Sequence, residues 1–382
     1  MDFSWSDEQL RSRERVVEFA RRELNERLLE RDRDGIFCRQ TWQSCADYGL
    51  LGLSVPEEFG GRAETDILSA MLVMDGLGYG CRDNGLAFAL NAQLWTVQLP
   101  IVRFGTDEQK ARSLPRMCSG EWIGAHAITE PEAGSDVYSL QTRAVKSEGG
   151  YVLNGRKRHV TLAPLADVAL VFATLDPALG KWGITAFLIE KDTAGFTAGP
   201  TQSKMGLRTA PMGELILEDC FVPESSRLGP EGAGVSISSH SLEYERCCIL
   251  ASQLGAMERQ LEAAVRYARE REQFGQPIGK FQSVSNRIAD MKLRLEAARL
   301  LLYKVAWLKH TGQPAMMEAA LLKLYLSESF VASGLDAIRI FGGNGYLTDY
   351  EVERDLRDAI GGTLFAGTSD IQRNIVSRLL GV

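Results

Sequence analysis

Hydrophobic positions along the chain change their period twice. Before about residue 120, apolar residues recur every three or four positions, which predicts helices over 7–30, from 41 onward, over 67–77 and over 84–104. The period then falls to two, which predicts strands over 168–174, 184–190 and 214–222. Helical spacing returns in four long segments, near 235–272, 281–311, 315–340 and 352–380.

These changes of period divide the chain into three domains of an α+β fold. We expect an N-terminal α-helical domain over 1–120 and a small antiparallel β-barrel or sandwich over 121–230. The four long segments of 231–382, joined by short turns rich in Gly and Pro, predict a four-helix bundle.

Short local signals refine the elements. Ser6 and Gln9 have the spacing of a capping box at the first helix. Asn154-Gly155 lies between two alternating stretches and predicts a type I′ hairpin. Ser369 and Gln372 predict a second capping box, with Ser369 as the N-cap. The helix after it is expected to bury one apolar face, formed by Ile371, Ile375, Val376, Leu379 and Leu380.

Composition and charge limit the possible partners. A net charge of −7 argues against nucleic acid, which needs a clustered basic surface. No apolar run approaches the roughly 18–20 residues of a membrane span, and the first residues lack the features of a secretory signal. Seven cysteines without CxxC spacing predict reduced thiols and no metal site. Together these features predict a cytoplasmic protein that binds neither nucleic acid nor membrane.

The C-terminal decad Leu364-Phe-Ala-Gly-Thr-Ser-Asp-Ile-Gln-Arg373 carries a more specific signal. Taken alone, it predicts a turn followed by an ordinary helix. It also resembles the active-site turn of the acyl-CoA dehydrogenase family, Tyr-Glu-Gly-Thr-Ser-x-Ile-Gln-Arg. The Glu of that pattern is the catalytic base in most members, and Ala366 stands in its place here. Because alanine keeps its backbone N–H, the resemblance still implies an oxyanion-hole donor at Ala366.

A second motif, Ile128-Thr-Glu-Pro-Glu-Ala-Gly-Ser-Asp136, precedes the predicted strands. Gly134 permits close backbone approach to a ligand, and Ser135 adds a hydroxyl beside N–H groups, which suits a phosphate. A plain polar turn has the same composition. The nonamer also resembles the family's FAD signature, which implies that Ile128 and Thr129 face the flavin ring and that Gly134 and Ser135 hold the pyrophosphate.

The same resemblance implies further FAD contacts. Thr161 matches a second flavin contact, and Arg271 matches a residue that meets the FAD of a neighbouring subunit, with Phe274 and Gln282 around its adenosine end. Gly343 and Thr368 complete the set of matching positions. An FAD completed by a second subunit implies at least a dimer, and the family is usually a homotetramer, a dimer of dimers.

Three cofactor-site residues depart from the family pattern. His159 replaces the usual Trp against the flavin, Arg339 replaces Gln, and Asp370 replaces Gln or Glu. His159 removes apolar ring area and adds a titratable group, which bears on the electron acceptor. Arg339 adds a charge that could strengthen phosphate binding.

With Ala366 unable to take a proton, the base must lie elsewhere. One branch of the family, which includes isovaleryl-CoA dehydrogenase, places it in a Leu-Glu-Arg segment of the first bundle helix, and Glu245-Arg246 matches that position. Burial would raise the pKa of Glu245 toward neutrality, and Arg246 is expected to contact the substrate. The alternatives are that Glu243 is the base, or that Glu245 is an ordinary exposed glutamate in a charged segment.

Several segments further resemble family members from natural-product pathways: 257–261, 291–300, 339–343 and 365–370. These members oxidise aminoacyl groups, notably prolyl, held on a carrier protein. The resemblance implies dehydrogenation of an acyl-CoA or of an acyl or peptidyl carrier protein, with electron-transfer flavoprotein or O₂ as acceptor. A flavin monooxygenase and a non-enzymatic scaffold remain alternatives.

Overall fold

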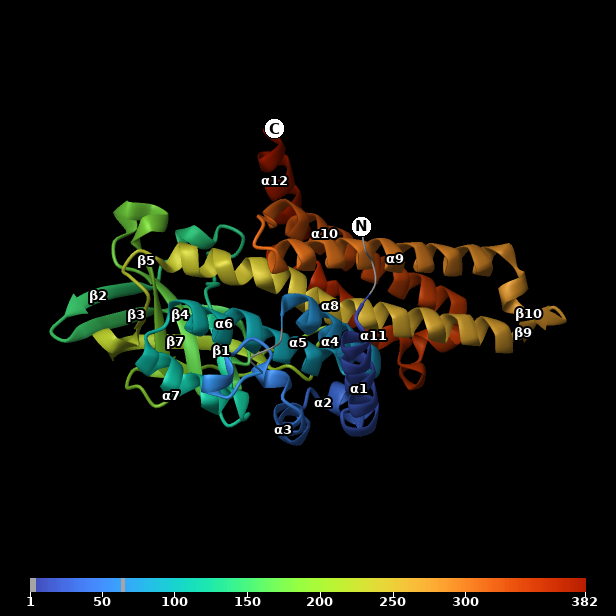
Figure 1. Cartoon of the computed structure of the whole chain (residues 1–382), viewed down its shortest axis with the longest axis horizontal. Helices are drawn as coiled ribbons and strands as arrows, with labels where there is room; N and C mark the ends of the chain where they lie inside the picture. Colours follow the sequence, from blue (N-terminus) through green and yellow to red (C-terminus); the bar gives the residue numbers. More distant parts are fainter. Residues whose placement is uncertain (1–4, 63–65) are drawn as a thin grey trace.

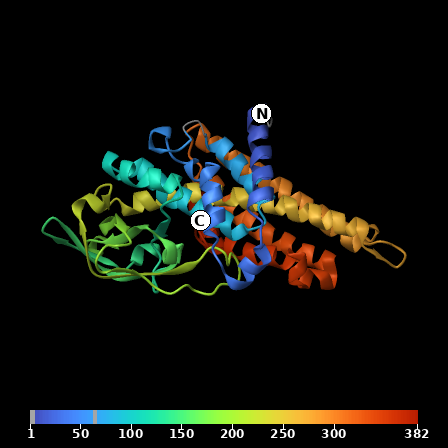
Figure 2. The same cartoon turned by 90° about the horizontal axis from the view of Figure 1, so that it is seen from below.

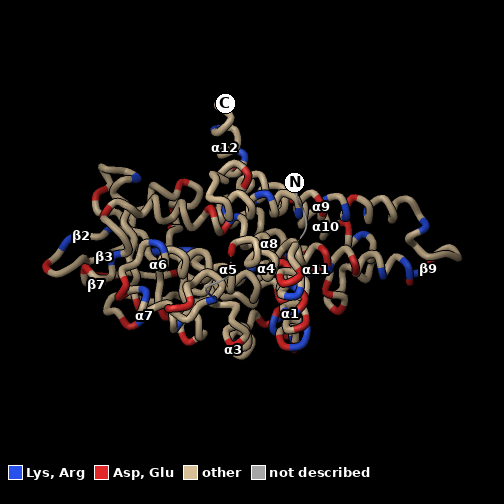
Figure 3. The backbone as a smooth tube through the Cα atoms, in the orientation of Figure 1, with Lys and Arg blue, Asp and Glu red and all other residues tan. Residues whose placement is uncertain are grey.

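The computed structural model describes residues 5–62 and 66–382 and contains the three predicted regions in order (Figure 1). The first region is helical and consists of α1 (Asp7–Glu23), α2 (Leu28–Asp34), α3 (Arg39–Asp47), α4 (Ile67–Gly80), α5 (Asn84–Gln93), α6 (Leu99–Phe104) and α7 (Asp107–Cys118). The predicted capping box of Ser6 and Gln9 is confirmed at α1. Both signs of charge crowd along α1 (Figure 3), which covers the apolar helix α4.

One sequence expectation fails in this region. The helices α5 and α6 join through a π-helical segment, Leu94–Gln98, into a run of 21 residues that is long and apolar enough to cross a membrane. Because polar residues such as Gln93 and Gln98 interrupt the run, the apolar pattern of the sequence did not predict it. Because 78% of its apolar window is buried, this run is a core helix of the described structure.

The middle region is a sheet with strands β1 (Gly124–Ala127), β2 (Arg143–Ser147), β3 (Gly150–Thr161), β4 (Val168–Thr174), β5 (Ile184–Glu190), β6 (Phe196–Ala198), β7 (Met212–Pro223) and β8 (Arg227–Leu228). Its strand order is β6-β7-β3-β2-β4-β5-β8, and β1 pairs with β4. Most pairs are antiparallel, as predicted, but β1 and β2 both pair with β4 in parallel.

The predicted hairpin at Asn154-Gly155 is wrong. Both residues lie inside β3, at a bulge where the register with β7 shifts between Leu153 and Gly155. Asn154 bridges to β7 by exchanging hydrogen bonds with Asp219, at 3.1 and 2.8 Å. A Cβ at position 155 would lie 2.4 Å from the Thr142 hydroxyl, so this glycine permits close strand approach.

The last region contains α8 (Gly234–Glu270), α9 (Gln282–His310), α10 (Met316–Phe341), α11 (Val352–Gly362) and α12 (Ser369–Leu380). The first three helices confirm the predicted segments. The fourth segment is broken in two by a turn that contains Ala366 and Gly367, both with positive φ. Between α8 and α9, the short strands β9 (Glu272–Gln273) and β10 (Gln276–Pro277) form a hairpin.

The second predicted capping box is also wrong. Thr368, not Ser369, is the N-cap of α12 and accepts from the N–H of Ile371. Gln372 instead donates to the carbonyls of Ala366 and Gly367. The predicted buried face is buried only in part. Ile371, Ile375 and Val376 are half-buried, whereas Leu379 and Leu380 are exposed on a helix that projects from the bundle (Figure 1).

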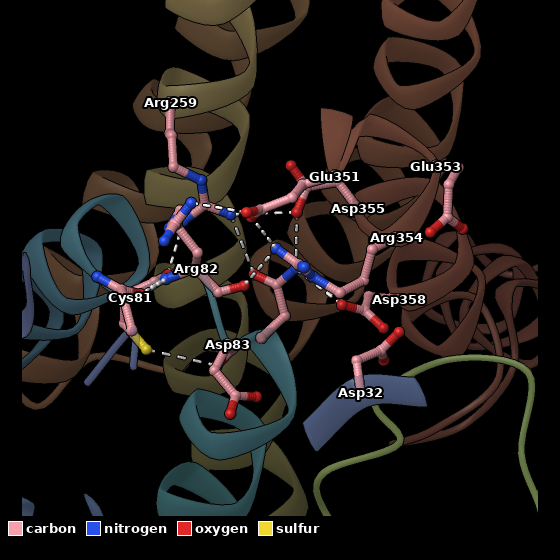
Figure 4. A network of polar contacts seen from close by, with 12 residues as sticks. Asp32, Cys81, Arg82, Asp83, Arg259, Glu351, Glu353, Arg354, Asp355 and Asp358 are labelled. Atoms are coloured by element: carbon pink, nitrogen blue, oxygen red, sulfur yellow. Dashed lines mark hydrogen bonds and ion pairs between the residues drawn. The ribbon is translucent and has the colours of Figure 1, made fainter. Parts of the chain in front are cut away.

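The two helical regions share one hydrophobic core, which extends from Trp42 through Leu254 to Leu302. Polar contacts join them at one edge, where Arg259 of α8 donates to the Cys81 carbonyl and Arg82 binds Glu351 (Figure 4). The helix α8 runs from the sheet to the β9–β10 hairpin at the far end of the molecule (Figures 1 and 2). It is therefore the element that connects all three regions.

Candidate active site

Two carboxylates of α8 lie close in sequence but in different environments. Glu243 forms an ion pair with Lys309 at 2.6 Å. Glu245 is partly buried, and no described residue forms a hydrogen bond or ion pair with it. Burial raises the pKa of Glu245 to about 7, although the charges of Arg246 and Lys323 oppose the rise. Of the two, Glu245 therefore has the environment that a general base near neutrality requires.

The Ala366 turn lies beside this part of α8. The Arg246 Nε donates to the Ala366 carbonyl at 3.2 Å, which brings together residues 120 positions apart. Ala366 has a φ of 54°, a left-handed conformation that costs a non-glycine residue about 1–2 kcal/mol. The Gln372 amide holds the turn by donating to the same carbonyl at 3.1 Å.

The Ala366 N–H is free to bind a ligand. No group in the described part of the chain accepts a hydrogen bond from it, whereas the Ala366 carbonyl accepts two. A donor held by a constrained turn, which contacts the residue next to an unpaired carboxylate, suits the stabilisation of a developing oxyanion while a proton is removed.

A small cavity lies one to two turns further along α8. Its volume is about 10 Å³, and its lining includes Ile249 and Gln253 of α8 with Phe88 of α5. Phe365 of the Ala366 turn packs against Phe88, with ring centroids 4.8 Å apart. Because the space is the size of one water, this side of the site is closed to a long acyl chain.

A buried ion pair fixes the predicted FAD loop to β3. Lys157 of β3 is fully buried and binds Glu130 at 2.7 Å, and its Nζ also donates to the Ile128 carbonyl at 3.2 Å. The Arg158 N–H donates to the Thr129 carbonyl at 2.8 Å. The Lys157 side chain and the Arg158 backbone N–H, both of β3, therefore hold residues 128–130 against this strand.

The exposed part of this loop suits a phosphate. Gly134 and Ser135 are exposed, and their N–H groups donate to no acceptor among the described residues. A Cβ built on Gly134 meets nothing within 4 Å, so the space beside it is open. Open space beside unused N–H groups fits the pyrophosphate of FAD.

His159 and Thr161 lie at the end of β3, close in sequence to Lys157. A second bulge, between Lys157 and Val160, leaves His159 exposed with a φ of 56°. Thr161 is partly buried and pairs with Met212 of β7. The same bulge therefore directs Lys157 into the core and His159 outward.

Four other predicted FAD residues lie away from this loop. Arg271 ends α8, Gln282 begins α9, and Phe274, at the tip of the hairpin between them, is 93% exposed. This tip and the sheet occupy opposite ends of the molecule (Figure 1), so the structure does not bring the two groups together within one chain. Arg339, at the end of α10, pairs with Asp336 at 3.5 Å.

The remaining predicted residues flank turns. Gly343 is exposed, and a Cβ there would meet nothing within 4 Å. The Thr368 hydroxyl caps α12, and Asp370 is exposed and binds Arg373 at 3.1 Å. Asp370 therefore has a local structural partner in the chain.

Sequence reasoning missed two buried lysines near the site. The sequence pattern did not predict the burial of Lys157 in β3 or of Lys323 in α10. Lys323 is fully buried in the apolar run Ala319-Ala-Leu-Leu-Lys-Leu-Tyr-Leu326. A lysine within such a run was the signal available in the sequence.

Comparison with known proteins assigns the family. The acyl-CoA dehydrogenase N-terminal, middle and C-terminal domain models match residues 6–121, 125–220 and 232–381. The L-prolyl-[peptidyl-carrier protein] dehydrogenase of Pseudomonas fluorescens is 44% identical over 381 residues, which cover 100% of both chains.

Solved structures agree with this assignment. The prolyl acyl carrier protein oxidase AnaB superposes with a TM-score of 0.98 at 50% identity, covering 99% of this chain and 100% of AnaB. PigA with FAD and proline superposes with a TM-score of 0.97 at 42% identity, covering 100% of this chain and 99% of PigA. The predicted fold is confirmed, and the chain belongs to the acyl-CoA dehydrogenase family.

Proposed function

We propose that this protein is an FAD-dependent dehydrogenase that oxidises the Cα–Cβ bond of a prolyl group carried as a thioester on a peptidyl carrier protein. The observation that carries the proposal is Glu245, a partly buried, unpaired carboxylate beside the Arg246–Ala366 contact. The full-length similarity to a prolyl-carrier-protein dehydrogenase supports the choice of substrate.

The chain's own residues account for the proton chemistry. Glu245 takes the α-proton of the thioester, and its pKa of about 7 keeps a useful fraction ionised near neutrality. The Ala366 N–H donates to the thioester oxygen as negative charge develops there. Arg246 holds the Ala366 carbonyl, so it orients the donor and lies beside the substrate.

FAD fits the described loop. Gly134 and Ser135 would hold the pyrophosphate, while Ile128, Thr129, His159 and Thr161 would lie along the flavin, which accepts the β-hydride when bound. The Lys157–Glu130 pair keeps the loop in place. The small cavity beside Phe88 and Phe365 supports a compact acyl group over a long aliphatic one.

The residues at and around the β9–β10 hairpin support an oligomeric assembly. Because Arg271, Phe274 and Gln282 lie far from the chain's own FAD loop, they would serve the cofactor of a neighbouring subunit, with Arg339 and Gly343 near the same interface. The exposed apolar residues Leu379 and Leu380 of α12 are consistent with a further subunit contact. We therefore propose a homotetramer, which sedimentation of the holoenzyme would test.

Anaerobic bleaching of the bound flavin tests the activity. We expect L-prolyl carrier protein to bleach it within seconds, and a panel of straight-chain acyl-CoA thioesters to bleach it slowly. Rapid bleaching by an acyl-CoA, but not by the prolyl carrier protein, would overturn the choice of substrate.

Flavin reduction that required NAD(P)H would favour a monooxygenase, and a protein that binds no flavin would favour the scaffold alternative. Admitting O₂ or electron-transfer flavoprotein after bleaching identifies the acceptor.

A further inference from the structure

Lys323 is a buried cation without a hydrogen-bonding partner. Its side chain is fully buried in α10, and its Nζ forms no hydrogen bond in the described structure. Burial lowers its pKa to about 8. Leaving an ammonium group in such a place is unfavourable, and a methionine would pack there without this desolvation cost.

The charged groups that face Lys323 come from two helices. Helix α10, which packs along α8, contributes Glu328, and α8 contributes Glu245 and Arg246. Glu328 is 48% exposed and lies 3.9 Å from Arg373, so it is turned toward solvent. Arg246 is itself a cation. Glu245 is therefore the anion that faces Lys323 inside the protein.

The influence of the two groups is mutual. The charge of Lys323 lowers the pKa of Glu245, and the charge of Glu245 raises the pKa of Lys323, each against the larger effect of burial. Neither group forms a direct ion pair in the described structure. Each therefore acts on the other through space, across the contact between α8 and α10.

We propose that Lys323 is a positioning residue that keeps Glu245 ionised before the substrate binds, so that the base is ready to accept the α-proton. The inference rests on the proposed role of Glu245. In the reaction, the proton passes from the α-carbon to the Glu245 carboxylate, and Lys323 keeps its own proton. Its positive charge is needed, and its hydrogen-bonding capacity is not.

The test is Lys323→Met in the holoenzyme, with Lys323→Arg as the charge-retaining variant. We expect the apparent pKa for flavin reduction by substrate to rise by about one unit in Lys323→Met. Below that pKa the rate falls about tenfold, and at high pH it recovers. Lys323→Arg should restore most of the low-pH rate. Lys309→Met is the matched control, because Lys309 pairs with Glu243 on the same helix, and it should leave the pH profile unchanged.

A second measurement does not depend on turnover. Infrared difference spectra of the resting holoenzyme, recorded against Glu245→Gln to identify the band, report the ionisation of Glu245 directly. The band should titrate about one unit higher in Lys323→Met. If Lys323→Met does not fold, Lys323→Gln serves for both measurements.

The outcomes separate the inference from the proposed function. An unchanged band and pH profile in a folded Lys323→Met or Lys323→Gln, with flavin reduction still dependent on Glu245, would overturn the inference alone. Full flavin reduction by Glu245→Gln would overturn the base assignment and the inference with it. A loss of rate that is equal at every pH would show that Lys323 acts only through packing, and would also overturn the inference.

Discussion

In the described structure two lysines, Lys157 and Lys323, are buried, and they differ in how each meets a glutamate. Lys157 binds Glu130 at 2.7 Å, and Glu130 also accepts from the Thr142 N–H at 3.0 Å. Although burial opposes it, Lys157 keeps the pKa of Glu130 below its usual value. Lys323 and Glu245 form no such contact, and burial raises the pKa of Glu245 to about 7.

The difference separates a structural pair from a reactive one. A carboxylate with several donors stays ionised and fixes the backbone around it, as Glu130 does for the FAD loop. A carboxylate without donors can exchange a proton near neutrality, as proposed for Glu245. The same two residue types therefore give either a rigid support or a base, depending on direct contact.

The largest effect is expected from removing the reactive carboxylate. Glu245→Gln should lower the rate of flavin reduction by substrate about 10²–10⁴-fold, because an amide cannot accept the α-proton. Glu243→Gln is the control, since Glu243 pairs with Lys309, and it should retain most of the rate. Stopped-flow bleaching of the flavin measures both, and the opposite order would make Glu243 the base.

Breaking the structural pair should affect folding most. Glu130→Gln leaves Lys157 buried beside a neutral partner, which should lower the free energy of unfolding by about 3–5 kcal/mol. The measurement is urea denaturation at pH 7. Glu190→Gln, which removes a surface pair with Arg112, is the control and should cost less than about 1 kcal/mol. Equal losses in the two variants would contradict the structural role of Glu130.

Glu245 should also make stability depend on pH. Its folded pKa of about 7 lies above the ordinary value of 4.5, so its protonated form stabilises the fold below pH 4.5. This contribution is lost as pH rises to 7. The unfolding temperature of Glu245→Gln, relative to the wild type, should therefore increase from pH 5 to pH 8. A constant difference across that range would place Glu245 in solvent.

The smallest effect is expected at the hairpin tip. Phe274→Ala should change the free energy of unfolding by less than about 0.5 kcal/mol, because the ring is 93% exposed in the chain. If the tip serves a neighbouring FAD, the variant should release its flavin several-fold faster. Flavin fluorescence after dilution measures the release. Trp182→Ala, which alters an exposed aromatic residue at the end of the molecule that carries the sheet, is the control with unchanged release.

The elements that were predicted correctly are those whose sequence signal is local. The strands 168–174 and 184–190 and the first three bundle helices follow from their periodicity. Asn154-Gly155 was misassigned because its neighbours, Asp219 of β7 and Thr142 just before β2, are distant in the sequence. The N-cap of α12 is Thr368 and not the predicted Ser369, because the Gln372 side chain donates to the Ala366 carbonyl. This contact depends on the backbone conformation of the turn.

The candidate site was predictable only through resemblance. Periodicity could place Glu245 on a helix but could not distinguish it from Glu243, because the difference depends on Lys309 of α9. The roles of Lys323 and Lys157 depend on tertiary packing, which places them near Glu245 and Glu130. Pairings between distant segments are not encoded in local spacing.

The length of α8 has a consequence for engineering. Its 37 residues form a rod of about 55 Å, with Glu245 in its first third and Arg271 directly after its last residue. Deleting one residue between them would turn the two ends by about 100° relative to each other. An insertion of about 18 residues, five full turns, would restore the angle but would add about 27 Å. The spacing along α8 should therefore tolerate substitutions much better than any change in length.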